Sequence, residues 1–131
     1  MAKRIIMAIV AVFFSWSVLD FILHGVLLKP IYEATASLWR PMEEMNMPLT
    51  YLVTLVSAAC FVLIYSLLVG KKTPGSGIQF GALFGLAAGI SMGFGSYSYM
   101  PIPVTLAWGW FFGTVLEAIV AGAIVGAIVK S

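Results

Sequence analysis

The sequence predicts an all-α membrane protein, a single transmembrane domain over residues 1–131 with four helices in an up-down bundle. Of the 131 residues, 62% are hydrophobic and 9% are charged, and the mean hydropathy is +1.07. A water-soluble domain of this length has no core large enough to bury so much apolar surface. Four apolar windows of about 20 residues fit in the chain, each long enough to cross a bilayer core of about 30 Å. The apolar runs are continuous rather than alternating, which argues against a β-barrel.

The first predicted span covers residues 5–28 and follows two basic residues, Lys3 and Arg4. A secretory signal peptide also begins with a basic segment before an apolar one. This stretch is too long for a signal peptide, carries Asp20 and His24, and has no A-x-A cleavage site within residues 5–28. We therefore expect a helix that is retained in the mature protein.

The first outer loop, residues 29–48, is the longest segment outside the four spans. Pro30 can begin a helix in this loop. Four apolar or aromatic residues recur on one helical face, namely Ile31, Tyr32, Leu38 and Trp39. The spacing predicts a short helix at the membrane interface. An irregular loop held against lipid by its aromatic side chains is the alternative.

Three further spans are predicted at residues 49–69, 77–98 and 104–129. The segment 70–77 contains lysine, glycine, proline and small polar residues, which favours a flexible turn. The segment 99–103 contains two prolines, which end the third span and start the fourth. Because these turns are short, consecutive helices are expected to be antiparallel neighbours.

The basic residues predict the orientation of the bundle. Five of them fall on one side of the predicted membrane, namely Lys3, Arg4, Lys71, Lys72 and Lys130. Two fall on the other side, namely Lys29 and Arg40. Cytoplasmic loops carry an excess of Lys and Arg. Both chain ends are therefore expected in the cytoplasm, with loop 29–48 outside.

Small residues in the last two spans predict close helix packing. The third span carries a glycine at every fourth position, namely Gly77, Gly81, Gly85, Gly89 and Gly93. The fourth span carries two adjacent rows, Gly109 and Gly113 in one and Ala118, Gly122 and Gly126 in the other. In lipid, helices associate through close packing and polar contacts, which small residues permit. Such a glycine zipper also fits a self-association face, or a groove for a lipid or quinone tail.

Two ionisable residues lie near the outer end of the first span. Asp20 and His24 are four residues apart and so share a helix face, with Ser17 three residues before Asp20. Ionisable residues inside a membrane are costly and need partners or water. The spacing fits a structural hydrogen-bonded pair, a site for a proton or substrate, or two ligands of a divalent metal.

A third ionisable residue, Glu117, stands near the middle of the fourth span in the same row as Gly109 and Gly113. That row is expected to face the bundle rather than lipid. The functional interpretation is a carboxyl group that binds a proton or cation during transport. The structural alternative is a protonated carboxyl that donates a hydrogen bond to a neighbouring helix. Sequence alone leaves open whether Glu117 meets Asp20 and His24, because their depths in the membrane differ.

A methionine run, Met42, Met45 and Met47, lies in the outer loop. Soft thioethers at this spacing can bind Cu(I). Methionine also fills irregular gaps at interfaces. The run has no cysteine or histidine beside it, so the copper site is the weaker interpretation.

Several function classes lack their sequence signals. The chain has no nucleotide-binding loop, Ser/His/Asp order, zinc signature or haem-attachment motif, and its single histidine excludes bis-histidine haem ligation within one chain. No basic cluster indicates nucleic acid. We therefore expect a non-enzymatic protein without a cofactor, whose partners are the lipid bilayer and either further copies of itself or the subunits of a larger membrane complex.

The layout of the chain is similar to that of an uncharacterised family of small bacterial four-helix membrane proteins. The shared features are a basic start, a loop that closes with Trp39-Arg-Pro-Met, a glycine-rich third span and a Gly-x-x-x-Gly fourth span at Gly122 and Gly126. The resemblance covers the whole chain and implies a bacterial cytoplasmic (inner) membrane. It implies no activity, so no functional residue is carried over.

The expected function is transporter-like, with membrane-embedded carboxylates that handle a proton, a cation or a small solute. An accessory or structural subunit of a larger membrane complex is the alternative. A lipid- or quinone-binding module is a third possibility.

Overall fold

The computed structural model describes residues 1–130, which are helical apart from turns and loops and contain no strand. Four helices in this part of the chain are long and apolar enough to cross a membrane. They cover Ala2–Leu27, Met47–Leu68, Pro74–Gly95 and Val104–Ile128. The prediction of an all-helical protein with four helices long and apolar enough to span a membrane is therefore confirmed.

Two of the spanning helices end in a wider, π-helical turn. Helix α1 (Ala2–Ile22) continues into η1 (Leu23–Leu27), and α4 (Pro74–Ile90) continues into η4 (Ser91–Gly95). In η1 the backbone N–H of Leu28 donates to the carbonyl of Leu23, five residues back, at 2.8 Å. Such single π turns inside α-helices are frequent at functional sites.

The first outer loop contains a short helix, but it is broken. Helix α2 (Lys29–Ala34) ends at Thr35, and the 3₁₀ turns η2 (Ala36–Leu38) and η3 (Met42–Glu44) follow. The indole nitrogen of Trp39 donates to the Thr35 hydroxyl at 2.9 Å, which folds the loop back on itself. Its apolar side chains pack against a buried cluster of Leu28, Ile102 and Leu106. The loop therefore lies on the protein at the N-terminal end of α5.

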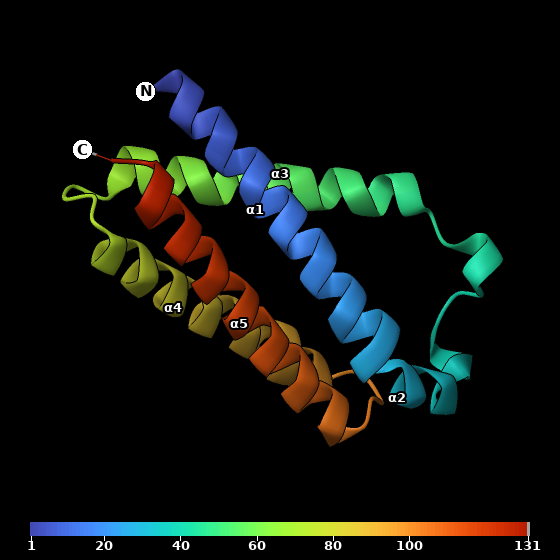
Figure 1. Cartoon of the computed structure of the whole chain (residues 1–131). Coiled ribbons are helices and arrows are strands. Elements are labelled where there is room, and N and C mark those ends of the chain that lie inside the picture. The colour runs from blue at the N-terminus through green and yellow to red at the C-terminus, as the bar shows by residue number, and fades with distance from the viewer. Residues whose placement is uncertain (131) are drawn as a thin grey trace.

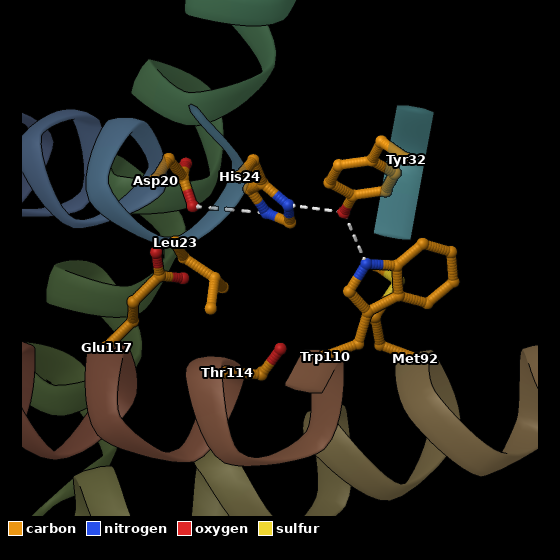
Figure 2. Close-up of a pocket in the computed structure, with 8 residues that line it drawn as sticks. All are labelled: Asp20, Leu23, His24, Tyr32, Met92, Trp110, Thr114 and Glu117. Carbon is orange, nitrogen blue, oxygen red and sulfur yellow. Dashed lines mark hydrogen bonds and ion pairs between the residues drawn. The ribbon is translucent and has the colours of Figure 1, made fainter. Parts of the chain in front are cut away.

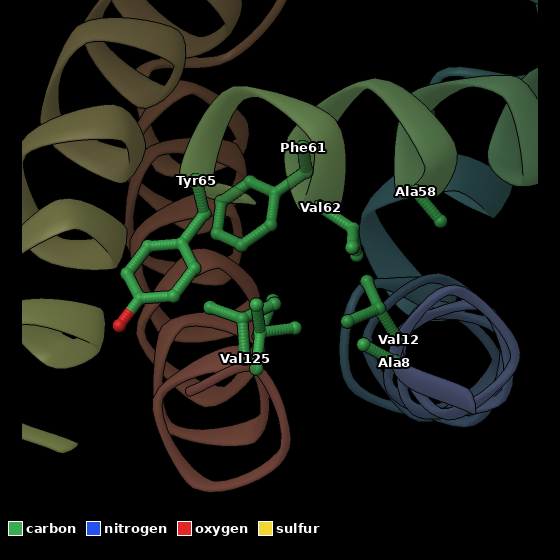
Figure 3. Close-up of a cluster of buried hydrophobic side chains, with 9 residues drawn as sticks. Ala8, Val12, Ala58, Phe61, Val62, Tyr65 and Val125 are labelled. Atoms are coloured by element: carbon green, nitrogen blue, oxygen red, sulfur yellow. The ribbon is translucent and has the colours of Figure 1, made fainter. Parts of the chain in front are cut away.

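Helix α3 (Met47–Leu68) crosses the other helices at a large angle (Figure 1). Its N-terminus is capped by the Asn46 side chain, which accepts a hydrogen bond from the backbone N–H of Leu49 at 3.0 Å. All of its buried residues lie in its second half, namely Ala58, Phe61, Val62 and Tyr65. These side chains form a core with residues of α1 and α5 (Figure 3). The first half of α3 packs against none of the described helices closely enough to bury a residue.

Helices α4 and α5 (Val104–Ile128) pack along one seam of small residues. A Cβ atom added at Gly77 would meet the carbonyl oxygen of Gly122, and one added at Gly81 would meet that of Ala118. A Cβ atom at Gly93 would lie 2.5 Å from the carbonyl oxygen of Ala107. The two backbones are therefore in direct contact, which only glycine allows at these positions.

The second glycine row of α5 faces a different neighbour. A Cβ atom at Gly109 would lie 2.7 Å from Cδ2 of Leu28, and one at Gly113 would meet Cδ2 of Leu23. These leucines stand in and just after the π turn of the first span. One row of α5 thus packs against α4 and the adjacent row packs against the end of the first span.

The basic residues of the chain ends gather at one end of the molecule. The Arg4 guanidinium donates to the carbonyl oxygen of Ile128 at 3.4 Å, which joins the start of α1 to the end of α5. Lys72 and Lys130 line one surface pocket at the turn between α3 and α4. Figure 1 shows both chain ends beside this turn, opposite the outer loop.

Candidate functional site

A cavity of about 320 Å³ lies where the end of the first span, α2 and α5 meet. Its lining joins ionisable, aromatic and apolar side chains, namely Asp20, Leu23, His24, Tyr32, Met92, Trp110, Thr114 and Glu117 (Figure 2). Both π turns contribute to it, η1 through His24 and η4 through Met92. The cavity therefore collects three of the ionisable residues that the sequence singles out.

Asp20 and His24 lie on one face of the first span, as their spacing predicts. The distance from Nε2 of His24 to Oδ1 of Asp20 is 3.9 Å, longer than a hydrogen bond. Their side chains are 40% and 43% exposed, respectively, within the isolated chain. The two side chains are thus not hydrogen-bonded, and they attract each other electrostatically when the imidazole is protonated.

The hydroxyl group of Tyr32 joins the first span to α5. Trp110 Nε1 donates to this oxygen at 2.7 Å, and His24 Nδ1 lies 2.6 Å from it. An indole N–H can only donate, so the Tyr32 oxygen accepts from Trp110 and its own hydrogen is free to point at Nδ1. A neutral His24 then carries its proton on Nε2, the nitrogen nearest Asp20.

The environment of Tyr32 keeps this hydroxyl protonated. Burial raises its pKa above the ordinary value of 10.0, and the negative charge of Asp20 raises it further. The hydrogen bond from Trp110 acts in the opposite direction. At neutral pH the phenol is therefore a hydrogen-bond donor.

Glu117 extends from α5 toward Leu23 and Asp20 (Figure 2). Its carboxyl group lies close enough to that of Asp20 for the two side chains to interact directly. One oxygen, Oε1, is buried and has no hydrogen-bond partner among residues 1–130. The structure thus brings Glu117 to Asp20, which the sequence left open, and provides a buried acceptor beside it.

The backbone of Glu117 is also tied to the first span. Trp16 Nε1 donates a 2.8 Å hydrogen bond to its carbonyl oxygen. Trp16 and Asp20 are four residues apart and share a face of α1. This contact places the carboxyl-bearing turns of α1 and α5 side by side.

Five lining residues were not predicted, namely Leu23, Tyr32, Met92, Trp110 and Thr114. Trp110 and Thr114 precede Glu117 by seven and three residues along α5, so all three share one helix face. The position of Glu117 could therefore have indicated the other two. Nothing in the sequence indicated that Tyr32 and Met92 would reach the site. Tyr32 reaches the site because the outer loop folds onto α5, and Met92 reaches it from a π turn.

Other predicted residues lie outside the cavity. The Ser17 hydroxyl is buried, is not part of the lining, and has no hydrogen-bond partner within residues 1–130. Met42, Met45 and Met47 are exposed in the outer loop and at the start of α3. In the described part of the chain, no group of three or more His, Cys, Asp or Glu residues is placed to hold a metal ion. The copper site at the methionine run stays a prediction.

Comparisons with models of known families, with curated proteins and with solved structures find no match. The candidate chemistry follows from the lining of the cavity. Its lining contains two carboxyl groups and one imidazole, and no lysine or arginine. A low-dielectric cleft lined by acidic groups concentrates positive charge.

Proposed function

We propose that this chain is a transporter-like, non-enzymatic protein of the bacterial cytoplasmic membrane, in which Asp20 and Glu117 hold a proton or a cation during transport. One observation carries the proposal. Carboxyl groups from two different spans meet at one cavity, where Glu117 Oε1 is buried without a partner among the described residues. Ionisable groups inside a membrane mark ion and proton pathways.

The distribution of basic residues supports an inward location for both chain ends. Arg4 and Lys130 lie at the same end of the molecule as the turn between α3 and α4. Because cytoplasmic segments carry the excess of Lys and Arg, this end faces the cytoplasm. The cavity then lies toward the outer half of the membrane, beneath α2, and Tyr32 is its outermost polar group.

The two carboxyl groups suit an exchange of positive charge. Two carboxylates at short range in a low dielectric repel each other unless a proton or a cation lies between them. Release of that charge in one direction requires its replacement from the other. His24 and Tyr32 lie between Asp20 and loop 29–48, with one short hydrogen bond between them and a 3.9 Å separation between His24 and Asp20. Closing that separation would complete a path along which a proton can move.

Proton flux in proteoliposomes tests the proposal. The protein is reconstituted with a pH-sensitive dye inside the vesicles, and a pH gradient is imposed. We expect Glu117→Gln to abolish the pH-dependent flux while the helix content and the elution volume in detergent stay the same. Glu44→Gln is the matched control, because Glu44 is exposed in the outer loop. Flux that is equal in wild type and Glu117→Gln, or absent from wild type under every gradient, contradicts the proposal.

An accessory subunit of a larger membrane complex is the second candidate, and the first half of α3 favours it. Large apolar side chains on several faces of this half are exposed, namely Leu49, Tyr51, Leu52, Val53, Leu55 and Val56. Helices of another subunit can pack against such a segment in the membrane. Purification in mild detergent separates the two candidates: an accessory subunit co-purifies with a larger partner, whereas a homogeneous homo-oligomer contradicts that role.

A further inference from the structure

We propose that the cavity binds a small organic cation, a protonated amine that carries an apolar or aromatic group. The inference rests on the proposed function, because it names the class of cargo for the same carboxyl groups. Charge is the first reason. Asp20 and Glu117 face the cavity, the other titratable groups in its lining are His24 and Tyr32, and none of the lining residues is a lysine or arginine. A cation is the ligand that satisfies this arrangement.

The remaining lining favours an organic cation over a metal ion. Hard divalent ions take six or more oxygen ligands, and residues 1–130 hold no cluster of three acidic, histidine or cysteine side chains suited to a metal. Leu23 and Met92 instead present apolar surface to the cavity. Trp110 and Tyr32 present aromatic rings, whose faces attract ammonium groups.

The buried oxygen of Glu117 favours an amine that still carries an N–H group. Oε1 accepts no hydrogen bond from the described residues, and leaving such an acceptor unsatisfied is costly. A protonated primary amine can donate to it and attract both carboxyl groups. A quaternary ammonium has the charge but no hydrogen to donate, so it is expected to bind more weakly.

The size of the cavity limits the ligand. About 320 Å³ is at the small end of ligand pockets, which range over about 300–1,000 Å³. An amine with one aromatic ring suits such a volume. Binding of the ammonium displaces a proton that the carboxyl pair would otherwise hold, and that proton passes to water. The total charge at the carboxyl pair is the same before and after the exchange.

Calorimetric titration of the purified full chain at neutral pH tests the inference. The probe is benzylamine, which is protonated at this pH, with benzyltrimethylammonium, benzyl alcohol and benzoate as comparisons. We expect saturable binding of benzylamine, several-fold weaker binding of the quaternary compound, and no binding of the alcohol or the acid. Equal binding of benzyl alcohol would identify a site for neutral ring compounds and overturn the inference. Absence of saturable amine binding would overturn it as well.

Variants locate the binding site. Glu117→Gln and Asp20→Asn are each expected to weaken benzylamine binding at least tenfold, and Trp110→Leu several-fold. The controls are Glu44→Gln in the outer loop and Trp108→Leu, because Trp108 is 48% exposed and lies outside the cavity lining. Because a damaged fold would also lose binding, each variant is required to keep the wild-type helix content. Equal affinity in wild type and both carboxyl variants contradicts the assignment.

The same samples distinguish this inference from the proposed function. Proton flux that depends on Glu117 in the absence of any amine binding leaves the transport proposal standing and overturns the amine site. Amine binding that depends on Glu117 without proton movement in vesicles leaves the site standing and overturns the transport proposal. Amine-driven proton release from vesicles, lost in Glu117→Gln, supports both.

Discussion

The indole nitrogen of Trp16 donates a 2.8 Å hydrogen bond to the backbone carbonyl oxygen of Glu117. The bond joins α1 to α5 one helical turn before Asp20. Its acceptor is a backbone group, so the contact fixes the relative depth of the two helices and does not occupy the Glu117 carboxyl. The carboxyl stays available to the cavity because the helix that carries it is held elsewhere.

Replacement of Trp16 by Phe is expected to destabilise the protein modestly. The variant keeps a ring beside Phe61, whose centroid lies 5.5 Å from that of Trp16, but it loses the hydrogen bond. We expect the free energy of unfolding to fall by about 0.5–1.5 kcal/mol, measured by circular dichroism in a denaturing-detergent titration. Trp108→Phe is the control, since Trp108 is 48% exposed and the substitution keeps an aromatic ring beside Phe94. An equal loss in both variants would show that the hydrogen bond contributes nothing.

Substitution of Gly81 by Ala is expected to separate α4 from α5. The added methyl group would meet the backbone oxygen of Ala118, which cannot move aside as a side chain can. Overpacking of this kind costs about 1–3 kcal/mol. Gly95→Ala is the matched control in the same span, because the nearest atoms lie 3.8 Å from its Cβ position. Thermal unfolding in detergent compares the two, and identical midpoints contradict the backbone contact.

A double-mutant cycle tests the contact between Gly113 and Leu23. Gly113→Ala is expected to destabilise the protein because the new methyl group meets Cδ2 of Leu23. In a Leu23→Ala background the same substitution meets no such atom, so its cost decreases. We expect a coupling free energy of about 0.5–3 kcal/mol from the four unfolding curves. Strictly additive effects would place the two residues apart.

The hydroxyl of Tyr32 is expected to titrate above pH 10, since burial raises its pKa. Ultraviolet difference spectra of wild type against Tyr32→Phe isolate this group from the other tyrosines. Trp110→Phe removes a hydrogen bond that lowers the pKa and should raise it further, whereas Asp20→Asn removes a negative charge and should lower it. A lowered Tyr32 pKa in Trp110→Phe, or a raised one in Asp20→Asn, would contradict the network.

The raised pKa of Tyr32 also makes the free energy of unfolding depend on pH. Folding favours the protonated phenol, so the contribution of Tyr32 is complete below pH 10 and is lost as the pH rises through the raised value. The free energy of unfolding of wild type should therefore decrease more steeply above pH 10 than that of Tyr32→Phe. Unfolding titrations at several alkaline pH values measure the difference. Parallel curves would contradict the shift.

The sequence predicts the spans well because hydropathy responds to the bilayer, which acts on each helix separately. Hydropathy does not predict the angle at which α3 crosses the other helices. That helix is apolar on all sides, so no periodicity marks the face that packs, and only Ala58, Phe61, Val62 and Tyr65 of its second half become buried. The regular bundle expected from short turns therefore fails to describe the position of its first half.

The site was predictable only within single helices. The spacing of Asp20 and His24 placed them on one face, but their meeting with Glu117 depends on how α1 and α5 pack. The π turn at Leu23–Leu27 has no sequence signal that we identified, yet it carries His24 into the cavity. Tyr32 could not be assigned because its position depends on a loop that folds onto a helix far along the chain.

The seam between α4 and α5 also bears on how the protein assembles. Residues 96–103 join these helices by a short connection, so closing the hairpin costs little chain entropy. The first span must instead reach α5 across the whole of α2 and α3. Helices that insert independently associate afterwards. We expect the hairpin of α4 and α5 to form first and the first span to pack against it. Asp20, His24 and Tyr32 come from one half of the chain, and Trp110 and Glu117 from the other. The cavity therefore exists only once the two halves have met, and under the proposed function a newly inserted, half-assembled chain has no site for the transported charge.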